Sequence, residues 1–169
     1  MAADKTFLSL LDQASVIVPR VIEDADTHAV LEMWFAVVCY HVRHKIITVD
    51  DLLVLSRVAM TLAEELSDMS TTKIVSVLKE THVRKNAGYA GTINPDPWNN
   101  FRESERLGID AFTGCMVRLS DKVRRIHNLH LNPEDELVGE CMFDTAIDAA
   151  SYALIAACLL IEMEDNNGS

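Results

Sequence analysis

Glycine and proline are scarce in this chain and gather in one place, which leaves long stretches free to form regular secondary structure. The segment 88–97 holds two of the four prolines and two of the six glycines. Elsewhere, apolar residues recur at the spacing of helix faces, and no alternating runs are joined by turn pairs at hairpin spacing. The sequence therefore predicts an all-α helical bundle with its main loop at 88–97.

The length of 169 residues suits one domain with a sizeable core. A hydrophobic content of 49% with only 6% aromatic residues favours helix packing by aliphatic side chains and methionine. We expect helices at 5–18, 28–46, 50–67, 71–86, 98–107, 111–130 and 135–163, with starts at Asp50-Asp51, at Ser70 to Thr72 and after Pro133. Within this single domain 1–70 is an extra N-terminal helical segment, 71–163 carries the functional helices, and 164–169 is a tail.

The formal net charge of −11 limits the partners that the chain can bind. It opposes the phosphate neutralisation that duplex nucleic acid requires, so we expect no duplex partner. A small phosphate ligand is compatible with the negative net charge, because a few cations or a metal can make the electrostatic potential positive inside one pocket.

Cellular location is predicted from the apolar runs and the cysteines. The longest apolar run, 149–161, is too short to cross a bilayer, and the charged N-terminus does not resemble a signal peptide. We therefore expect a cytoplasmic protein without a membrane partner. Cysteines 39, 115, 141 and 158 lack CxxC spacing and are predicted to be buried, reduced thiols.

Three carboxylates follow one another at i, i+4 spacing just before that apolar run: Glu140, Asp144 and Asp148. Helical phase places them along one edge of a helix, beside the stripe that packs in the core. Like charges at this spacing repel, so they need solvent or a cation. A divalent metal site is one interpretation, and a solvated acidic face is the other.

A cationic strip is expected on the 111–130 helix, formed by Arg118, Lys122 and Arg125. Arginine forks and a lysine point charge are suited to phosphate oxygens, although an exposed basic face would look the same. Beside the acidic strip, the cations would complete a metal–polyphosphate site. Asp121 points almost opposite the apolar stripe, so we expect it to face solvent unless a subunit contact covers it.

Two HxxH pairs also occur, His41/His44 and His127/His130. Their spacing can ligate zinc, but neither has the glutamate of an HExxH motif or a nearby cysteine. We interpret them as ordinary surface or helix-end histidines.

Four segments between about 75 and 163 together resemble small phage and bacterial proteins related to the MazG-like, all-α nucleoside triphosphate pyrophosphohydrolases. The segments are KNAGYAG at 85–91, WNNFR at 98–102, RLSDKVRR at 118–125 and E-x3-D-T-x2-D-x3-Y at 140–152. The resemblance implies a helical enzyme that forms a homo-oligomer, a dimer or tetramer. It would use Mg2+ or Mn2+ to cleave a (d)NTP between the α and β phosphates, in the host cytoplasm if a phage encodes it.

The resemblance also implies roles for individual residues. Glu140, Asp144 and Asp148 match the acidic motif as metal ligands or water-positioning bases, and Asp121 with Lys122 matches an Asp-Lys pair, with Asp121 a further metal ligand. Glu140, Asp144 and Lys122 would be catalytic. The remaining matches, which would contact phosphate or nucleotide, are Lys85, Tyr89, Asn100, Arg118 and Arg125.

One departure from the family pattern leaves the number of metals open. Better-known members carry ExxE on the first metal-binding helix, where this chain has Asp121 and basic residues. Two alternatives also stay open. A noncatalytic acidic interaction protein would have all three carboxylates exposed, and a nucleotide-binding sensor would keep the site without turnover.

Overall fold

The computed structural model describes residues 2–17, 26–89, 96–133 and 141–167. These residues form seven α-helices and one 3-10 helix, and no strand occurs among them, which confirms the all-α prediction. The helices are α1 (Ala2–Ser15), α2 (Thr27–His44), α3 (Val49–Ser67), α4 (Thr71–Tyr89), α5 (Asn99–Arg102), η1 (Glu103–Leu107), α6 (Ala111–Leu131) and α7 (Met142–Asn167).

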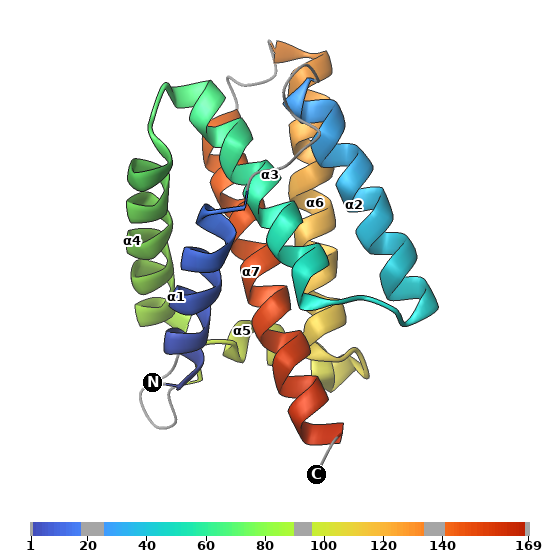
Figure 1. Cartoon of the computed structure of the whole chain (residues 1–169). Helices are drawn as coiled ribbons and strands as arrows, with labels where there is room; N and C mark the ends of the chain where they lie inside the picture. The colour runs from blue at the N-terminus through green and yellow to red at the C-terminus, as the bar shows by residue number, and fades with distance from the viewer. Residues whose placement is uncertain (1, 18–25, 90–95, 134–140, 168–169) are drawn as a thin grey trace.

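Helix α7 lies at the centre of the bundle, between α3 and α6 (Figure 1). Its buried face is rich in small side chains, which let neighbouring helices approach closely. Ser56 of α3 donates a hydrogen bond of 3.1 Å to the carbonyl oxygen of Ala150, deep in this contact. The alanines buried on α7 are Ala146, Ala149, Ala150, Ala153, Ala156 and Ala157.

The centre of the bundle therefore includes part of the expected N-terminal segment 1–70. Helix α3 makes its most extensive contact with α7, and most of its aliphatic residues from Leu52 to Ala63 are buried. At about 25 cal/mol per Å2 of apolar surface, such a face supplies much of the driving force for folding. The catalytic helices that the resemblance implies are thus packed on α3.

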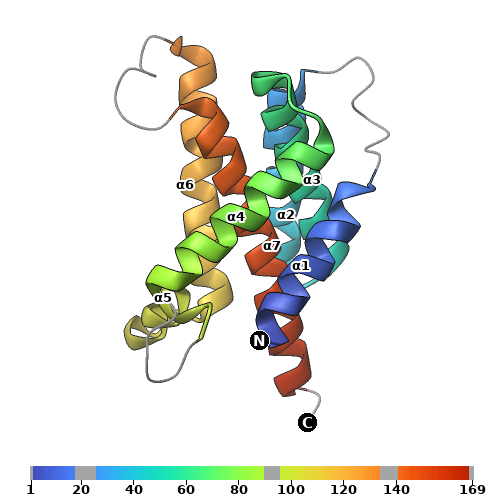
Figure 2. The ribbon, with the colours of Figure 1, turned by 90° about the vertical axis from the view of Figure 1, so that its left-hand side faces the viewer.

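Helices α1 and α4 cover the opposite side of the bundle from α2, and Figure 2 shows α4 running obliquely across the molecule toward α5. An aromatic cluster joins them. The Phe7 ring stacks on His82 of α4 at a centroid distance of 3.8 Å, and the fully buried Trp98 lies 6.4 Å from Phe7. This cluster fixes the second half of α4, at His82, against α1 and against Trp98, which directly precedes α5.

Several boundaries differ from the sequence-based expectation. Helix α3 begins at Val49 with Thr48 as its N-cap, so Thr48 caps the helix in place of the expected Asp50-Asp51. Thr48 accepts from the Asp51 amide while Asp51 accepts from the Thr48 amide, a reciprocal capping box. The expected helix 98–107 is a short α-helix followed by the 3-10 turn η1, which ends at Gly108 with φ 76°. The described part of α7 begins at Met142, and the expected start at 135 lies outside the described residues.

The prediction of buried cysteines is correct for two of the four. Cys115 and Cys158 are buried, whereas Cys141 is half-buried and Cys39 is exposed. In that turn of α2 the buried residue is Val38. Cys39 is the next residue along the helix, so the Cys39 side chain points away from the core. All four thiols are free.

Helix α7 is longer than the apolar run that suggested it. Its segment 142–166 has the length and hydropathy of a membrane span, but 78% of the apolar 18-residue window within it is buried inside the bundle. The apolar character of α7 is thus accounted for by its place at the centre of the core.

Candidate functional site

The site centres on a buried carboxylate that binds two lysines. Asp148 of α7 is only 7% exposed. Its Oδ1 accepts from Lys85 Nζ of α4 at 2.5 Å, and its Oδ2 lies 2.9 Å from Lys122 Nζ of α6. Three helices therefore meet at one carboxylate, and the three groups together carry one net positive charge.

A pocket of about 480 Å3 opens on one side of this cluster, between α4 and the first turns of α7. Its walls carry charge of both signs. Asp144 and Glu80 are exposed carboxylates, and Arg84 is an exposed cation. The full lining is Val77, Glu80, Thr81, Arg84, Lys85, Asp144, Ile147 and Asp148. We call this the acidic pocket.

A second pocket of about 170 Å3 shares Lys85 with the first and lies between α4, α5, α6 and α7. Arg118 supplies a further cation there and Asn100 an amide. Its lining is Lys85, Pro97, Asn100, Phe101, Arg118, Tyr152 and Ile155. We call this the basic pocket. Because Lys85 borders both pockets, a ligand with several anionic groups could occupy them together.

Tyr152 gives the basic pocket a hydrogen-bonding group. Its ring meets Phe101 edge to face at 5.9 Å. Burial raises the pKa of the Tyr152 phenol, and the Asp148 carboxylate adds to the increase, while Lys122 and Arg118 oppose it. The phenol therefore stays protonated at neutral pH and can donate a hydrogen bond.

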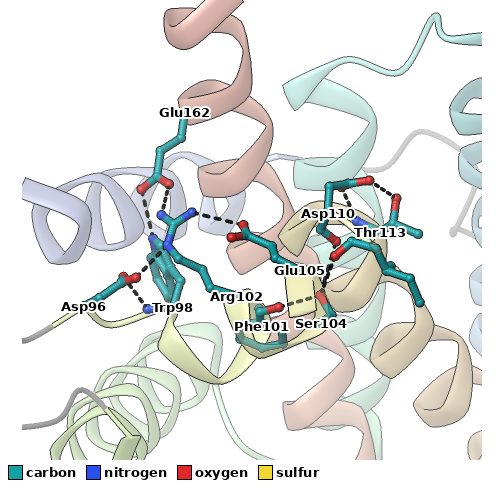
Figure 3. A network of polar contacts seen from close by, with 10 residues as sticks. Asp96, Trp98, Phe101, Arg102, Ser104, Glu105, Asp110, Thr113 and Glu162 are labelled. Atoms are coloured by element: carbon teal, nitrogen blue, oxygen red, sulfur yellow. Dashed lines mark hydrogen bonds and ion pairs between the residues drawn. The ribbon is translucent and has the colours of Figure 1, made fainter. Parts of the chain in front are cut away.

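An ion-pair network holds the short helix that carries Asn100 (Figure 3). Arg102 donates to Asp96 Oδ2 at 2.6 Å through Nε and to Glu162 Oε2 at 2.6 Å through a terminal nitrogen. The indole nitrogen of Trp98 donates to the other Glu162 oxygen at 3.2 Å. Charge-assisted bonds in a fork geometry are orientation-specific, so this network fixes α5 against the C-terminal half of α7.

Asp144 is positioned by the start of α7. The Asp144 amide donates to Cys141 Sγ at 3.4 Å, and the Cys141 thiol donates to Asp144 Oδ2 at 3.1 Å. Burial raises the pKa of the Cys141 thiol, and the neighbouring Asp144 carboxylate contributes, so the thiol keeps the proton that it donates. A carboxylate in the first turn is also favoured by the helix dipole.

Most residues that the sequence singles out do come together here. Asp144 lines the acidic pocket, Asp148 and Lys122 form the central cluster, and the basic pocket contains Asn100 and Arg118. Lys85 borders both pockets. The alternative of three exposed carboxylates is wrong for Asp148, which is buried against two ammonium groups.

Other expected site residues lie apart from the cluster or outside the description. Asp121 is exposed, as its helical phase predicts, and half-buried Arg125 lines neither pocket. Glu140 lies outside the described residues, and the same holds for the side chain of Tyr89.

Three pocket residues were not singled out from the sequence in these roles: Glu80, Arg84 and Tyr152. Glu80 and Arg84 are spaced i, i+4 on α4, with Arg84 directly before Lys85, and this pattern also describes an ordinary solvated helix face. Only the packing of α4 over the start of α7 distinguishes a pocket wall from a solvated face. That packing joins residues more than sixty positions apart in the sequence.

The donor set fits magnesium or manganese only in part. Asp144 and Asp148 offer carboxylates one turn apart, and Mg2+ is typically held by one or two carboxylates together with waters and substrate phosphates. Both Asp148 oxygens already contact lysines, and in the described part of the chain no group of three potential ligands gathers at this site. The set therefore suits a metal that arrives with a phosphate ligand better than a metal alone.

Comparisons of the chain with protein-family models, with curated proteins and with solved structures find no match. The functional assignment therefore depends on the residues of the site and on their contacts.

Proposed function

We propose that this protein is a metal-dependent nucleoside triphosphate pyrophosphohydrolase that converts a (d)NTP to a (d)NMP and pyrophosphate. One observation carries the proposal. Lys85 and Lys122 converge on Asp148, and Lys85 borders both pockets, of which the basic one contains Arg118 and the acidic one Asp144. Cations for phosphate oxygens thus lie beside carboxylates that can bind a metal, the combination that polyphosphate hydrolysis needs.

The cations of the cluster would bind the triphosphate. Lys85 and Lys122 would give up part of their contact with Asp148 and bind phosphate oxygens instead. A triphosphate carries at least as much negative charge as a carboxylate, so the lysines would stay paired. Arg118 would add a fork-shaped donor, and Asn100 with Tyr152 would hydrogen-bond to the nucleotide. The shared border at Lys85 would let the phosphates extend from one pocket into the other.

The carboxylates would hold the metal and the water. Asp144 and Asp148 would ligate Mg2+ or Mn2+, which supplies Lewis-acid polarisation of phosphate oxygens when bound. A water oxygen then adds to the α-phosphorus while the bond from that phosphorus to the bridging oxygen breaks. Asp144 would accept the proton of that water, and Lys122 would stabilise the charge of the departing pyrophosphate.

The assembly and location of the protein belong to the same proposal. A homo-oligomer in the cytoplasm, where nucleoside triphosphates are available, agrees with the family resemblance. A shallow apolar groove of about 260 Å3 between α2 and α6, which includes Phe35, Met116 and Val117, supports a contact between two copies of the chain.

The test is a panel of NTPs and dNTPs incubated with the protein and Mg2+ or Mn2+, with separate detection of monophosphate and pyrophosphate. We expect equal amounts of the two products from at least one nucleotide. Release of inorganic phosphate and a diphosphate would contradict cleavage between the α and β phosphates. Binding without any product would identify a sensor, and no binding would favour an interaction protein.

Matched substitutions connect the activity to the site. Asp144→Asn keeps the shape but removes the charge, so we expect turnover to fall by about 100-fold or more. Lys122→Ala should weaken nucleotide binding while the metal dependence persists. The control is Asp165→Asn, the same substitution at an exposed position near the other end of α7, which should leave turnover unchanged. Wild-type turnover in Asp144→Asn would refute the site assignment.

A further inference from the structure

Three histidines and two carboxylates gather where the start of α2 meets the end of α6, near the top of Figure 1. The His28 ring stacks on His130 at a centroid distance of 4.0 Å and lies 5.6 Å from the His127 ring. His127 Nδ1 lies 2.5 Å from Glu32 Oε1, and His130 Nε2 lies 3.7 Å from Asp26 Oδ2. Helix α2 contributes no residue to the acidic or the basic pocket, so this cluster is separate from the proposed nucleotide site.

His28 is the buried member of the cluster. The residue is only 6% exposed, and its Nε2 atom finds no hydrogen-bond partner among the described residues. A buried ring nitrogen without a partner has lost its water contacts and gained nothing in return.

The surrounding contacts hold His28 in place. The Asp26 side chain accepts from the His28 amide at 3.1 Å and caps α2. Thr27, the neighbouring residue, donates to Glu65 of α3 at 2.5 Å, which ties the same turn to a second helix. The backbone that presents His28 is thus fixed by bonds that a ligand of the ring would not disturb.

We propose that His28, Glu32 and His127 bind a divalent transition-metal ion of the zinc class. One ligand atom from each residue lies within 4.8 Å of the other two. Tetrahedral zinc with bonds of about 2.0–2.1 Å requires its ligand atoms to lie about 3.3 Å from one another. Rotation of the three side chains can bring their ligand atoms to this separation. His28 and Glu32 are spaced i, i+4 on one face of α2, and His127 reaches them from α6.

The ligand types select the metal. Two imidazoles and one carboxylate suit zinc, cobalt, nickel or iron, whereas magnesium prefers oxygen ligands and retains its waters. Asp26 and His130, which with His28 form a second group within 4.8 Å, are more exposed and would stand beside the ion rather than replace its ligands. Three protein ligands leave the fourth tetrahedral position to water.

The experiment uses the full chain, stripped of metal with a chelator and titrated with ZnCl2 by calorimetry, with bound zinc counted by elemental analysis. We expect one zinc per chain, a higher melting temperature with zinc, and no displacement by a thousandfold excess of Mg2+. His127→Gln and Glu32→Gln should each weaken binding by more than about 100-fold, because losing a ligand costs more than losing one of its outer hydrogen bonds.

His44→Gln, which changes a histidine of the same helix outside the cluster, is the matched control and should bind zinc like the wild type. The side chains of His127 and Glu32 are 27% and 40% exposed, so both variants should fold, and circular dichroism checks this. Absence of stoichiometric zinc in the wild type, or unchanged affinity in the folded His127→Gln variant, would overturn the proposal. Because this assay contains no nucleotide, its failure is distinct from failure of the proposed hydrolase activity.

Discussion

At the scale of single residues, Asp148 is the group on which the site depends most. Asp148→Asn removes the charge that two ammonium groups share, and we expect unfolding free energy to fall by about 1–3 kcal/mol, since both lysines keep some access to water. Asp144→Asn, at an exposed carboxylate on the same helix, should cost less than about 1 kcal/mol. Urea unfolding of both variants checks this difference. Equal stability losses would show that the Asp148 contacts contribute nothing specific.

A second residue-scale prediction concerns Asp51 in the capping box of α3. Burial tends to raise the pKa of Asp51, but hydrogen bonds from the Thr48 side chain and amide and from His41 lower it below its ordinary value of 3.8. The unfolded chain therefore binds a proton more readily, so stability is lost as pH falls from about 4 through the pKa of the folded protein.

Asp51→Asn should lower unfolding free energy by about 1 kcal/mol at pH 7 and remove this share of the acid dependence. Thermal melts between pH 7 and pH 3 measure both effects. A variant whose melting temperature falls with acid as steeply as that of the wild type would contradict the role given to the Asp51 carboxylate.

At the scale of elements, the turn η1 depends on Gly114 of α6. A Cβ atom at Gly114 would lie 2.5 Å from Ser104 Oγ and 3.0 Å from its Cβ. Ser104 Oγ is itself fixed by a hydrogen bond of 2.6 Å to the Phe101 carbonyl oxygen. Alanine gains up to about 1 kcal/mol of helix propensity, but the overlap should cost about 1–3 kcal/mol, so Gly114→Ala should be destabilising.

Calorimetry of a double-mutant cycle with Ser104→Ala tests this contact. In the Ser104→Ala background the cost of Gly114→Ala should shrink, because the closest atom is gone. Additive effects would show that the two positions do not touch.

Helices were predictable from the sequence because their signals are local. Apolar residues at helical spacing and the glycine- and proline-rich segment 88–97 are enough to predict the number and order of the long helices. The 3-10 turn was not predictable, because it depends on hydrogen bonds from the Ser104 hydroxyl to the Phe101 and Ile109 carbonyl oxygens and on the close approach of Ser104 to Gly114 of α6. The Thr48 cap of α3 was in principle predictable from the spacing of Thr48 and Asp51, which is that of a capping box.

The sequence predicted which residues belong to the site, but it did not predict their contacts. The family resemblance assigned Lys85, Lys122 and Asp148 to the same site, but it did not predict that both lysines contact one buried carboxylate. Lys85 and Asp148 are 63 positions apart, and only the packing of α4 against α7 joins them. The histidine cluster shows the same limit, because His28 lies almost a hundred residues from His127 and belongs to no local motif.

At the scale of the whole molecule, we expect self-association through the groove between α2 and α6. Val117 is 54% exposed beside this groove, and a second copy would cover it. Light scattering coupled to size-exclusion chromatography should report a dimer or tetramer at micromolar concentration. Val117→Glu should shift it toward monomer, whereas Val83→Glu, at an exposed valine of α4 outside the groove, should not. A wild-type monomer would exclude this assembly.

The positive excess at Asp148 belongs to a molecule whose formal charge is −11. A nucleotide that binds at the proposed site would therefore be repelled along most of its path and attracted only within about 10 Å of the lysines, the screening distance at 0.1 M ionic strength. Moderate salt should then speed association of the nucleotide, whereas higher salt should weaken the bound complex. In stopped-flow mixing, the association rate constant should rise between roughly 10 and 100 mM salt, whereas a protein that steers its ligand electrostatically would slow over the same range.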